Sequence, residues 1–366
     1  MSEAFDIAVV GAGAAGIAAA VTAARSGCRT LLLDQRESAG GTGGFSGLTT
    51  LCGLYDDAGQ MLNDGFAREF AEAIGEGPPV QTGKLWVLRY RPERFRELAT
   101  QLLDSAPNLV THWNTPVHNA SLAGGRITRL NGIAVGAVID CSGIAEVAHA
   151  VGANCLATDE STQASAVVFP LHDIARELDS VVAATQVLLP LARAGLPPVS
   201  FQPHPEPHSV TVKLTGSPEH APKVIEFLRQ NVAGFENCRT SCTEFCSSPR
   251  AGRMIVGEYV LIGDDVLHAR KFPDAVARCA WPVEQWNAAG VSRVRYLPPS
   301  EHYEIPARCL RAASIPNLFM AGKTISADVD AIASARVMGC CLATGAAAGN
   351  LAAAFVTSAQ QQQQQQ

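Results

Sequence analysis

The sequence lacks several features that would mark a membrane, nucleic-acid-binding or secreted protein. No uninterrupted apolar run reaches the roughly 18 residues that a membrane-spanning helix needs. Acidic residues outnumber basic ones by 34 to 28, so no basic surface for nucleic acid is indicated. Glu3 and Asp6 stand where a secretory signal peptide would carry basic residues. We therefore expect a cytoplasmic protein with no membrane span and no nucleic-acid partner.

C-x-x-C pairs are also absent, although the chain has 11 cysteines. An odd number without a secretory signal favours reduced thiols over a disulfide framework. Cys238, Cys242 and Cys246 recur at every fourth residue, which raises a metal or iron–sulfur site as an alternative. No fourth cysteine lies close to them, and single cysteines also pack as small buried hydrophobic residues. We expect no metal site.

What the chain does have is enough apolar material for a substantial core. It is 366 residues long, 47% of them hydrophobic, with a mean hydropathy of +0.11. That length suits one large or two medium domains.

Near the N-terminus, a short apolar run breaks into three glycines spaced G-x-G-x-x-G: Gly11, Gly13 and Gly16. The first glycine permits a tight turn, the second lets the backbone approach a pyrophosphate, and the third lets a helix pack on a strand. A helix expected over residues 17–25 then turns free N–H groups and its positive dipole end toward the phosphates. A second strand, 29–33, ends at Asp34, about the spacing at which a carboxylate accepts from ribose hydroxyls. This pattern predicts a dinucleotide site; the alternative is a Gly/Ala-rich helix packed tightly without a ligand.

Further along, hydrophobic spacing and turn residues predict the remaining elements. Residues 37–47 are rich in glycine and indicate a loop, and the polar tract 360–366 indicates a disordered tail. Expected helices cover 61–74, 92–104, 144–151, 175–189, 221–232 and 331–354, and expected strands cover 109–113, 117–122, 126–131, 136–143, 167–169, 210–214 and 317–322.

Four separated blocks carry a resemblance to a known family. They are Gly11–Gly16 with Asp34 and residues 40–42, then 138–143 (Val-Ile-Asp-Cys-Ser-Gly), 250–259, and 317–349. Together they resemble the FAD-dependent oxidoreductase family allied to glutathione-reductase-like and fumarate-reductase-like flavoproteins, which includes heterodisulfide-reductase-subunit-A-like proteins. The match covers most of the chain. It departs from the family in lacking a second G-x-G-x-x-G, so no built-in NAD(P)H domain is expected, and in carrying Ser248-Pro249-Arg250 where relatives often have a more acidic run.

This resemblance implies an α/β fold: a Rossmann-like FAD-binding domain of glutathione-reductase type with an inserted α+β substrate domain. The expected boundaries are 1–155 and 246–358 for the two parts of the FAD-binding domain, 156–245 for the inserted domain, and 359–366 for the tail.

The resemblance also implies FAD as the cofactor and the residues that hold it. A second glycine-ended strand and small-residue helix near the C-terminus favour FAD over NAD. The expected cofactor-binding residues are Gly11, Gly13, Ala14, Ala15, Gly16, Asp34, Gln35, Gly41, Thr42, Ser142, Gly143, Gly322, Lys323, Arg336 and Val337.

The expected reaction is hydride transfer between flavin N5 and a small organic substrate, with an unknown electron acceptor. Backbone N–H groups at the start of the Ala331 helix are suited to stabilise the charge that develops on the flavin, with residues 336–339 close by. Such a substrate needs a base for its proton, or an arginine if it is a carboxylate. The candidates for catalysis are His302, Arg250 and Arg336, with Arg253 and Tyr303 also considered; for the arginines the alternative is a structural ion pair with an acid such as Glu258.

Two other functions stay open at this point. One is an electron-transfer subunit working with iron–sulfur partners, and the other is a non-catalytic dinucleotide-binding module. Cys52 is a further candidate as a redox thiol, although no partner cysteine is spaced as in disulfide reductases. We expect Cys340 and Cys341 to pack in a helix, and His204 and His208 to lie at the surface.

Overall fold

A seven-stranded mixed sheet forms the centre of the computed structural model, which describes residues 4–158, 163–175, 180–287 and 292–364. Four parallel strands run side by side, and β20 adds a further parallel strand on β9. β9, β8 and β7 form an antiparallel extension. The order is β6 (Leu109–His112), β2 (Thr30–Leu33), β1 (Ala4–Val10), β9 (Ile133–Asp140), β8 (Arg126–Leu130), β7 (Ala120–Ala123), with β20 spanning Leu318–Met320.

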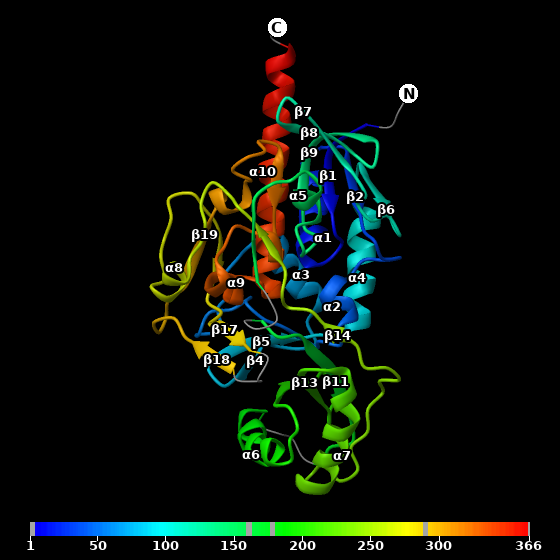
Figure 1. Ribbon diagram of the computed structural model, residues 1–366, viewed down its shortest axis with the longest axis vertical. Coiled ribbons are helices and arrows are strands. Elements are labelled where there is room, and N and C mark those ends of the chain that lie inside the picture. The colour runs from blue at the N-terminus through cyan, green and yellow to red at the C-terminus, as the bar shows by residue number, and fades with distance from the viewer. Residues whose placement is uncertain (1–3, 159–162, 176–179, 288–291, 365–366) are drawn as a thin grey trace.

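Two helices of small residues, α1 (Ala14–Arg25) and α10 (Met338–Gln364), pack against each other beside this sheet (Figure 1). A Cβ on Gly345 would lie 2.2 Å from the Ala15 carbonyl oxygen, and one on Gly349 would lie 2.6 Å from that of Ala19. The glycines therefore allow the two backbones to approach closely. By length and composition residues 338–362 would suffice to cross a membrane, but 72% of the apolar stretch is buried inside the protein, as in a core helix.

The remaining elements surround this centre. They are α2 (Gly41–Phe45), α3 (Phe66–Ile74), α4 (Pro92–Ser105), α5 (Glu146–Ala150), α8 (Gly263–Leu267) and α9 (Val329–Ala335), the sheet β3 (Thr50–Leu51), β5 (Leu85–Arg89), β4 (Val80–Thr82), and the strand pairs β10 (Cys155–Ala157) with β15 (Arg253–Ile255), β16 (Ala275–Cys279) with β19 (Tyr303–Pro306), and β17 (Val283–Trp286) with β18 (Ser292–Arg295).

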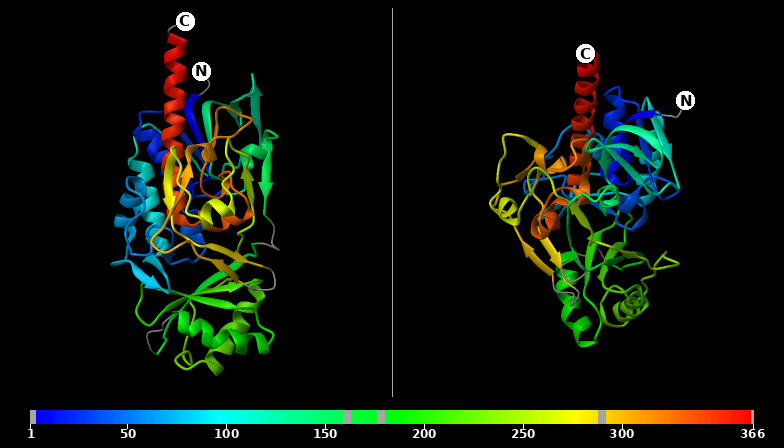
Figure 2. Two further views of the ribbon diagram at one scale, coloured as in Figure 1. Left: turned by 90° about the vertical axis from the view of Figure 1, so that its left-hand side faces the viewer. Right: turned by 45° about the horizontal axis from the view of Figure 1, so that its top comes forward.

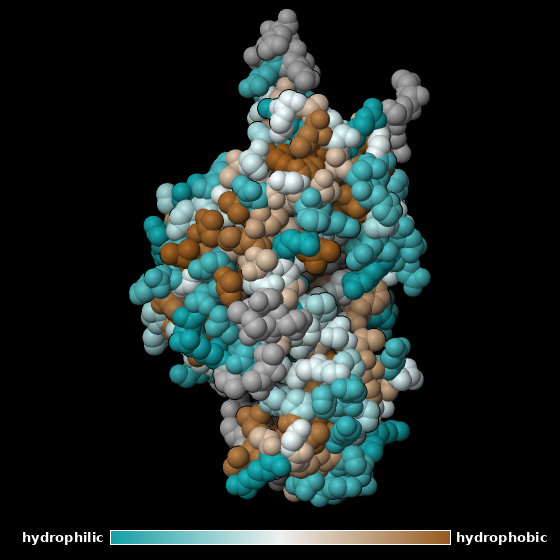
Figure 3. Space-filling model, in the orientation of Figure 1, coloured by the Kyte–Doolittle hydropathy of each residue, from teal (hydrophilic) through white to brown (hydrophobic). Residues whose placement is uncertain are grey.

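A four-stranded antiparallel sheet forms the end of the molecule opposite the C-terminus (Figures 1 and 2). Its order is β12 (Val199–Pro203), β13 (Val210–Thr215), β11 (Ala166–Leu171) and β14 (Ser247–Ser248). With α6 (Ser180–Arg193) and α7 (Ala221–Asn231) it encloses a hydrophobic core of its own. Hydrophilic and hydrophobic residues intermingle over its outer face (Figure 3).

Several expected elements differ from those observed. The helix expected over 61–74 begins only at Phe66, because Met61 pairs with Tyr55 and Gly65 has a positive φ of 65°. The strand expected over 117–122 starts at Ala120, since the Asn131 side chain, rather than a neighbouring strand, bonds the preceding backbone at Pro116, His118 and Asn119. The glycine loop contains the short helix α2. Part of the helix expected over 175–189 lies outside the described residues.

The C-terminal helix was predicted wrongly in two ways. It is interrupted at residues 336–337 and divides into α9 and α10, and it continues through the glutamine tract to Gln364. The interruption lets Gly339 approach Gly53, where its N–H donates to the Cys52 carbonyl at 2.8 Å. The tract extends a helix that is already nucleated, which requires only the modest helix propensity of glutamine.

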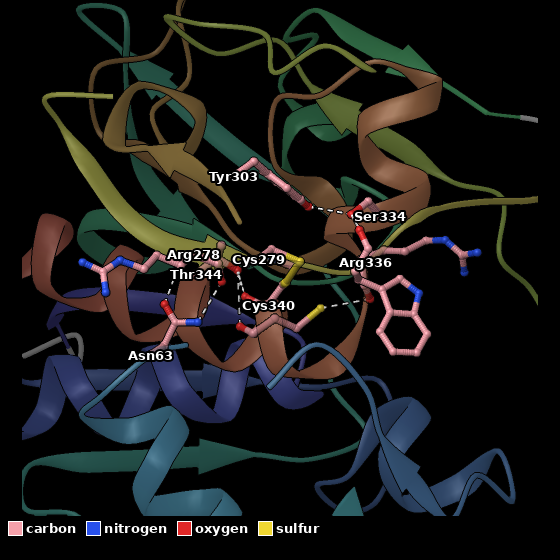
Figure 4. Close-up of a disulfide and its surroundings, with 11 residues drawn as sticks. Asn63, Arg278, Cys279, Tyr303, Ser334, Arg336, Cys340 and Thr344 are labelled. Atoms are coloured by element: carbon pink, nitrogen blue, oxygen red, sulfur yellow. Dashed lines mark hydrogen bonds between the residues drawn. A yellow bond between two sulfur atoms is a disulfide. The ribbon is translucent and has the colours of Figure 1, made fainter. Parts of the chain in front are cut away.

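A disulfide joins Cys279 at the end of β16 to Cys340 in the first turn of α10 (Figure 4). Both cysteines are fully buried. Cys340 does pack in a helix as expected, but the expectation of reduced thiols is wrong for this pair. Sixty-one positions separate the two cysteines in sequence, so no local spacing indicated the pair.

Candidate functional site

A cavity of about 890 Å³ runs from the carboxyl ends of β1 and β2 to the first turn of α10 and the middle of β13. Its walls come from both ends of the chain and from the four-stranded sheet. We call the part around Gly13 and Asp34 the nucleotide end, and the part around Lys213, Arg250, Glu284 and Arg336 the charged end.

At the nucleotide end the three glycines have distinct roles. Gly11 has a φ of 97°, and a Cβ there would lie 2.6 Å from the Cys141 carbonyl oxygen. A Cβ on Gly16 would lie 1.6 Å from the Gly11 carbonyl oxygen, so Gly16 sets the contact of α1 with the turn. Gly13 lines the cavity, and its Cβ would meet only the Gly41 Cα, at an ordinary 3.8 Å. The fold alone thus explains Gly11 and Gly16 but does not require a glycine at 13.

Asp34 closes this end. One carboxylate oxygen accepts from the Ala12 N–H at 2.5 Å and the other from the Arg36 N–H at 2.7 Å. These bonds hold the half-buried carboxylate at the cavity wall, and each oxygen keeps a second lone pair for a ligand hydroxyl.

The C-terminal strand β20 brings Gly322 to the same cavity. β1 and β20 lie on either side of β9, all three parallel. A Cβ on Gly322, which has a φ of 71°, would lie 2.9 Å from the Ala15 Cβ. The two glycine-ended strands expected from the sequence therefore meet in space.

Between them, β9 ends in a turn that Asp140 organises. The fully buried carboxylate accepts from the Ser142 hydroxyl at 2.7 Å and from the Val147 N–H at 3.0 Å. Burial raises the pKa of Asp140, partly offset by these bonds. The turn presents Ser142 and Gly143 at the cavity wall.

The charged end gathers side chains from four segments: Lys213 from β13, Arg250 after β14, Glu284 from β17, and Arg336 between α9 and α10. Lys213 and Arg250 both lie over the Trp286 ring, with 6.0 and 5.5 Å from the cation to the ring centroid. Arg336 donates to the Gln163 amide oxygen at 2.9 Å. In Figure 4 its guanidinium points away from the disulfide.

Glu284 is the carboxylate among these cations. The indole N–H of Trp286 donates to one oxygen at 2.6 Å and that of Trp281 to the other at 3.2 Å. Burial acts to raise the pKa of Glu284, but the positive charges of Lys213 and Arg336 outweigh it and lower the pKa to about 2. Burial lowers the pKa of Lys213, which Glu284 partly opposes.

Lys323, next to Gly322, also lines the cavity and donates to the Pro249 carbonyl at 3.3 Å. Burial and the nearby Arg336 lower the pKa of Lys323 to about 8. Burial raises the pKa of the cavity thiols Cys52 and Cys341 to about 11 and about 12, so both are protonated at neutral pH. Cys52 therefore lacks the thiolate that a reactive redox cysteine needs.

Most of the residues expected at the site line this one cavity. From the cofactor set these are Gly11, Gly13, Ala14, Ala15, Asp34, Gln35, Gly41, Thr42, Ser142, Gly143, Gly322, Lys323, Arg336 and Val337, and from the catalytic set Arg250 and Arg336. Gly16 packs beneath the turn instead.

His302, Tyr303 and Arg253 are not among the residues that line the cavity. The His302 carbonyl accepts from Lys271, and His302 directly precedes β19. The buried Tyr303 hydroxyl bonds to Ser334 at 2.8 Å (Figure 4), and Arg253 donates to the Ile144 carbonyl. The structure thus does not bring His302 to the site.

Two further expectations need correction. The first turn of α9 is capped by Asp328, whose carboxylate accepts from the Ala331 N–H at 2.7 Å, and it does not line the cavity; the start of α10 does. His204 lines the cavity rather than the surface, and burial lowers its pKa to about 4, whereas His208 is exposed. Within the described residues no group of three or more His, Cys, Asp or Glu side chains is placed to hold a metal ion.

A family model matches most of the chain, whereas curated proteins match short segments of it. A family model described as "FAD dependent oxidoreductase" matches residues 6–193 and 199–365. Sarcosine oxidase subunit alpha of Corynebacterium sp. (strain U-96) is 41% identical over 71 residues, 19% of this chain and 6% of that protein. Dihydrolipoyl dehydrogenase of Chlamydia muridarum (strain MoPn / Nigg) is 57% identical over 42 residues, 12% of this chain and 9% of that protein. The chain thus matches less than a tenth of either curated relative.

Solved structures resemble nearly the whole chain. A geranylgeranyl bacteriochlorophyll reductase-like protein from Thermoplasma acidophilum has a TM-score of 0.57 and 12% identity, over 97% of this chain and 79% of that one. GidA of Aquifex aeolicus has a TM-score of 0.53 and 12% identity, over 97% of this chain and 64% of that one. At this identity the likeness concerns the fold alone.

Proposed function

The chain belongs to the FAD dependent oxidoreductase family, and from this premise we propose that it exchanges a hydride between FAD and a small organic substrate at the charged end of the cavity. FAD is the cofactor, and when bound it supplies the redox chemistry. The observation that carries the proposal is that one cavity joins the turn around Gly13 to the charged end.

The nucleotide end fits the adenosine diphosphate part of such a cofactor. Gly13 leaves open the space that a Cβ would fill, and no contact within the fold calls for it. Phosphates approaching there would meet the N-terminal N–H groups of α1, while Asp34 would accept from ribose hydroxyls. We assign the turn at Gly13 and Asp34 to this role.

At the other end the chain's part is to hold the substrate and move its proton. Glu284, with a pKa of about 2, is too weak a base at neutral pH for efficient proton transfer. Lys323 lines the cavity and has a pKa of about 8, nearer to neutrality. We assign Lys323 to take up or return the substrate proton.

The test is the variant Gly13→Ala. The added methyl group has only ordinary contacts within the fold, so the apoprotein is expected to keep its melting temperature within about 2 °C. FAD content, measured by mass spectrometry of the released cofactor, is expected to fall at least tenfold. Gly75→Ala is the control for cofactor content, because this glycine also has a negative φ and lies outside the cavity. Its Cβ would lie 3.0 Å from Leu88 Cδ1 and 3.2 Å from the Ala71 carbonyl oxygen, so a lower melting temperature with full FAD content is expected.

Full FAD retention by Gly13→Ala would overturn the placement of the cofactor. A different outcome is that the wild-type protein carries FAD but neither a metabolite nor a reductant bleaches it. That outcome would support a non-catalytic dinucleotide-binding module.

A further inference from the structure

We propose that the substrate is a small organic acid whose carboxylate is held by Lys213 and Arg336 at the charged end of the cavity. This inference rests on the proposed function and adds the chemical class of the substrate.

The charged end has more positive than negative charge. Lys213 and Arg336 are cations, and Glu284 is the carboxylate that influences both. Arg250, which donates to the Ala164 carbonyl, is left out of this balance. Lys323 adds a further positive charge near Arg336 when it is protonated. Charge partly withdrawn from water is costly unless it is paired. An anionic ligand would supply the missing countercharge.

Two of these cations also keep donors that the described residues do not satisfy. Lys213 is half-buried, and within the described residues its ammonium group has no hydrogen bond or ion pair, only the Trp286 ring at 6.0 Å. Arg336 uses one guanidinium nitrogen on Gln163, while its buried Nε has no partner. Both side chains line the cavity, so donors remain for a ligand there.

Glu284 does not meet this need. Its two oxygens accept from the indole N–H groups of Trp286 and Trp281, and neither Lys213 nor Arg336 is among its ion-pair partners in the described part of the chain. The two indole N–H groups therefore hold the carboxylate beyond ion-pair distance of Lys213 and Arg336. A second carboxylate between Lys213 and Arg336 is expected to bind by charge-assisted hydrogen bonds, which are stronger than neutral ones.

The experiment uses the oxidised holoenzyme and three matched pairs of probes: benzoate with benzamide, phenylacetate with phenylacetamide, and malonate with malonamide. Each pair has nearly the same shape and differs in charge. Binding is followed by the change in the flavin absorption spectrum and, separately, by the shift in melting temperature. We expect at least one acid to bind ten times or more tightly than its amide.

Lys213→Gln and Arg336→Gln are each expected to weaken binding of that acid at least tenfold and to leave its amide unchanged. Lys223→Gln is the matched control, because Lys223 is an exposed lysine on α7 of the same sheet unit. Lys213→Arg, which keeps the charge, is expected to restore part of the affinity.

The proposal is overturned if no acid binds better than its amide, or if Lys213→Gln and Lys223→Gln behave alike. Failure of the proposed function has a different signature, namely purified protein without FAD. In that case the melting-temperature shift still compares acid with amide and decides on the carboxylate site.

Discussion

The nucleotide end of the cavity is made mainly of backbone, whereas the charged end is made of side chains. At the nucleotide end, glycines allow a strand, a turn and a helix to approach within distances that no Cβ would tolerate. At the charged end, three cationic side chains and one carboxylate come from four separate segments, and two indole N–H groups hold the carboxylate. Added atoms should therefore damage the first end, and changes of charge should affect the second.

The largest effect is expected from Gly16→Ala. Its Cβ would lie 1.6 Å from the Gly11 carbonyl oxygen, so α1 would have to move away from the turn. We expect a loss of about 3 kcal/mol or more in the free energy of unfolding, measured by urea denaturation. A variant as stable as the wild type would show that the turn is not packed as described.

Next comes Cys340→Ala, which removes the disulfide between the end of β16 and the start of α10. A cross-link over 61 positions is expected to stabilise the protein by roughly 3–4 kcal/mol relative to the reduced chain. Because Cys340 does not line the cavity, the variant should keep its FAD. Comparing the melting temperatures of the wild type with and without a reductant tests the same bond, and identical temperatures would argue against it.

A smaller loss is expected from Glu284→Gln. The substitution removes the negative charge that acts on Lys213 and Arg336, at a cost of about 2–3 kcal/mol for a partly buried group. Malonate should restore part of the melting temperature in this variant and have less effect on the wild type. The same loss with no response to malonate would point to packing rather than charge.

The smallest effect concerns pH. Both Lys323, with a pKa of about 8, and Lys213 have lowered pKa values, so each loses its positive charge at a lower pH than an ordinary lysine. Affinity for a carboxylate probe should fall by about threefold as the pH rises through about 8, where Lys323 loses its proton. It should fall again when Lys213 loses its proton, which happens before the pH reaches the 10.5 of an ordinary lysine. Glu284, Arg250, Arg336 and Cys52 also act on Lys213 but do not change charge near pH 8.

Lys323→Met tests the fall in affinity near pH 8. In this variant the affinity for the carboxylate probe should not change with pH around 8. A fall that persists there in Lys323→Met would assign the step to another group.

The same contrast explains what the sequence could predict. The α/β fold and FAD were predictable because the G-x-G-x-x-G turn and Asp34 follow each other within one strand–helix–strand unit, and both predictions are confirmed. Lys213 and Glu284 were missed, since they lie 71 positions apart on strands of different sheets and no local pattern marks either. Lys213 falls in phase with Thr211 and Thr215 along β13, where an alternating strand places its polar residues, so the sequence did not mark it as a charge in a largely buried strand.

The break between α9 and α10 was equally hidden. Residues 331–354 contain no proline and are mostly small or apolar, and the interruption accompanies the contact of Gly339 with the distant Gly53. His302 was expected near the cofactor because of the neighbouring sequence, but it is not among the residues that line the cavity.

The most direct test of the central claim is a crystal structure of the FAD-loaded protein. The account predicts the adenosine ribose against Asp34, the pyrophosphate over Gly13, and the flavin ring beside Gly322 and Arg336. An adenosine ribose away from Asp34, or a flavin ring in a region that shares no wall with Lys213 and Arg336, would contradict it.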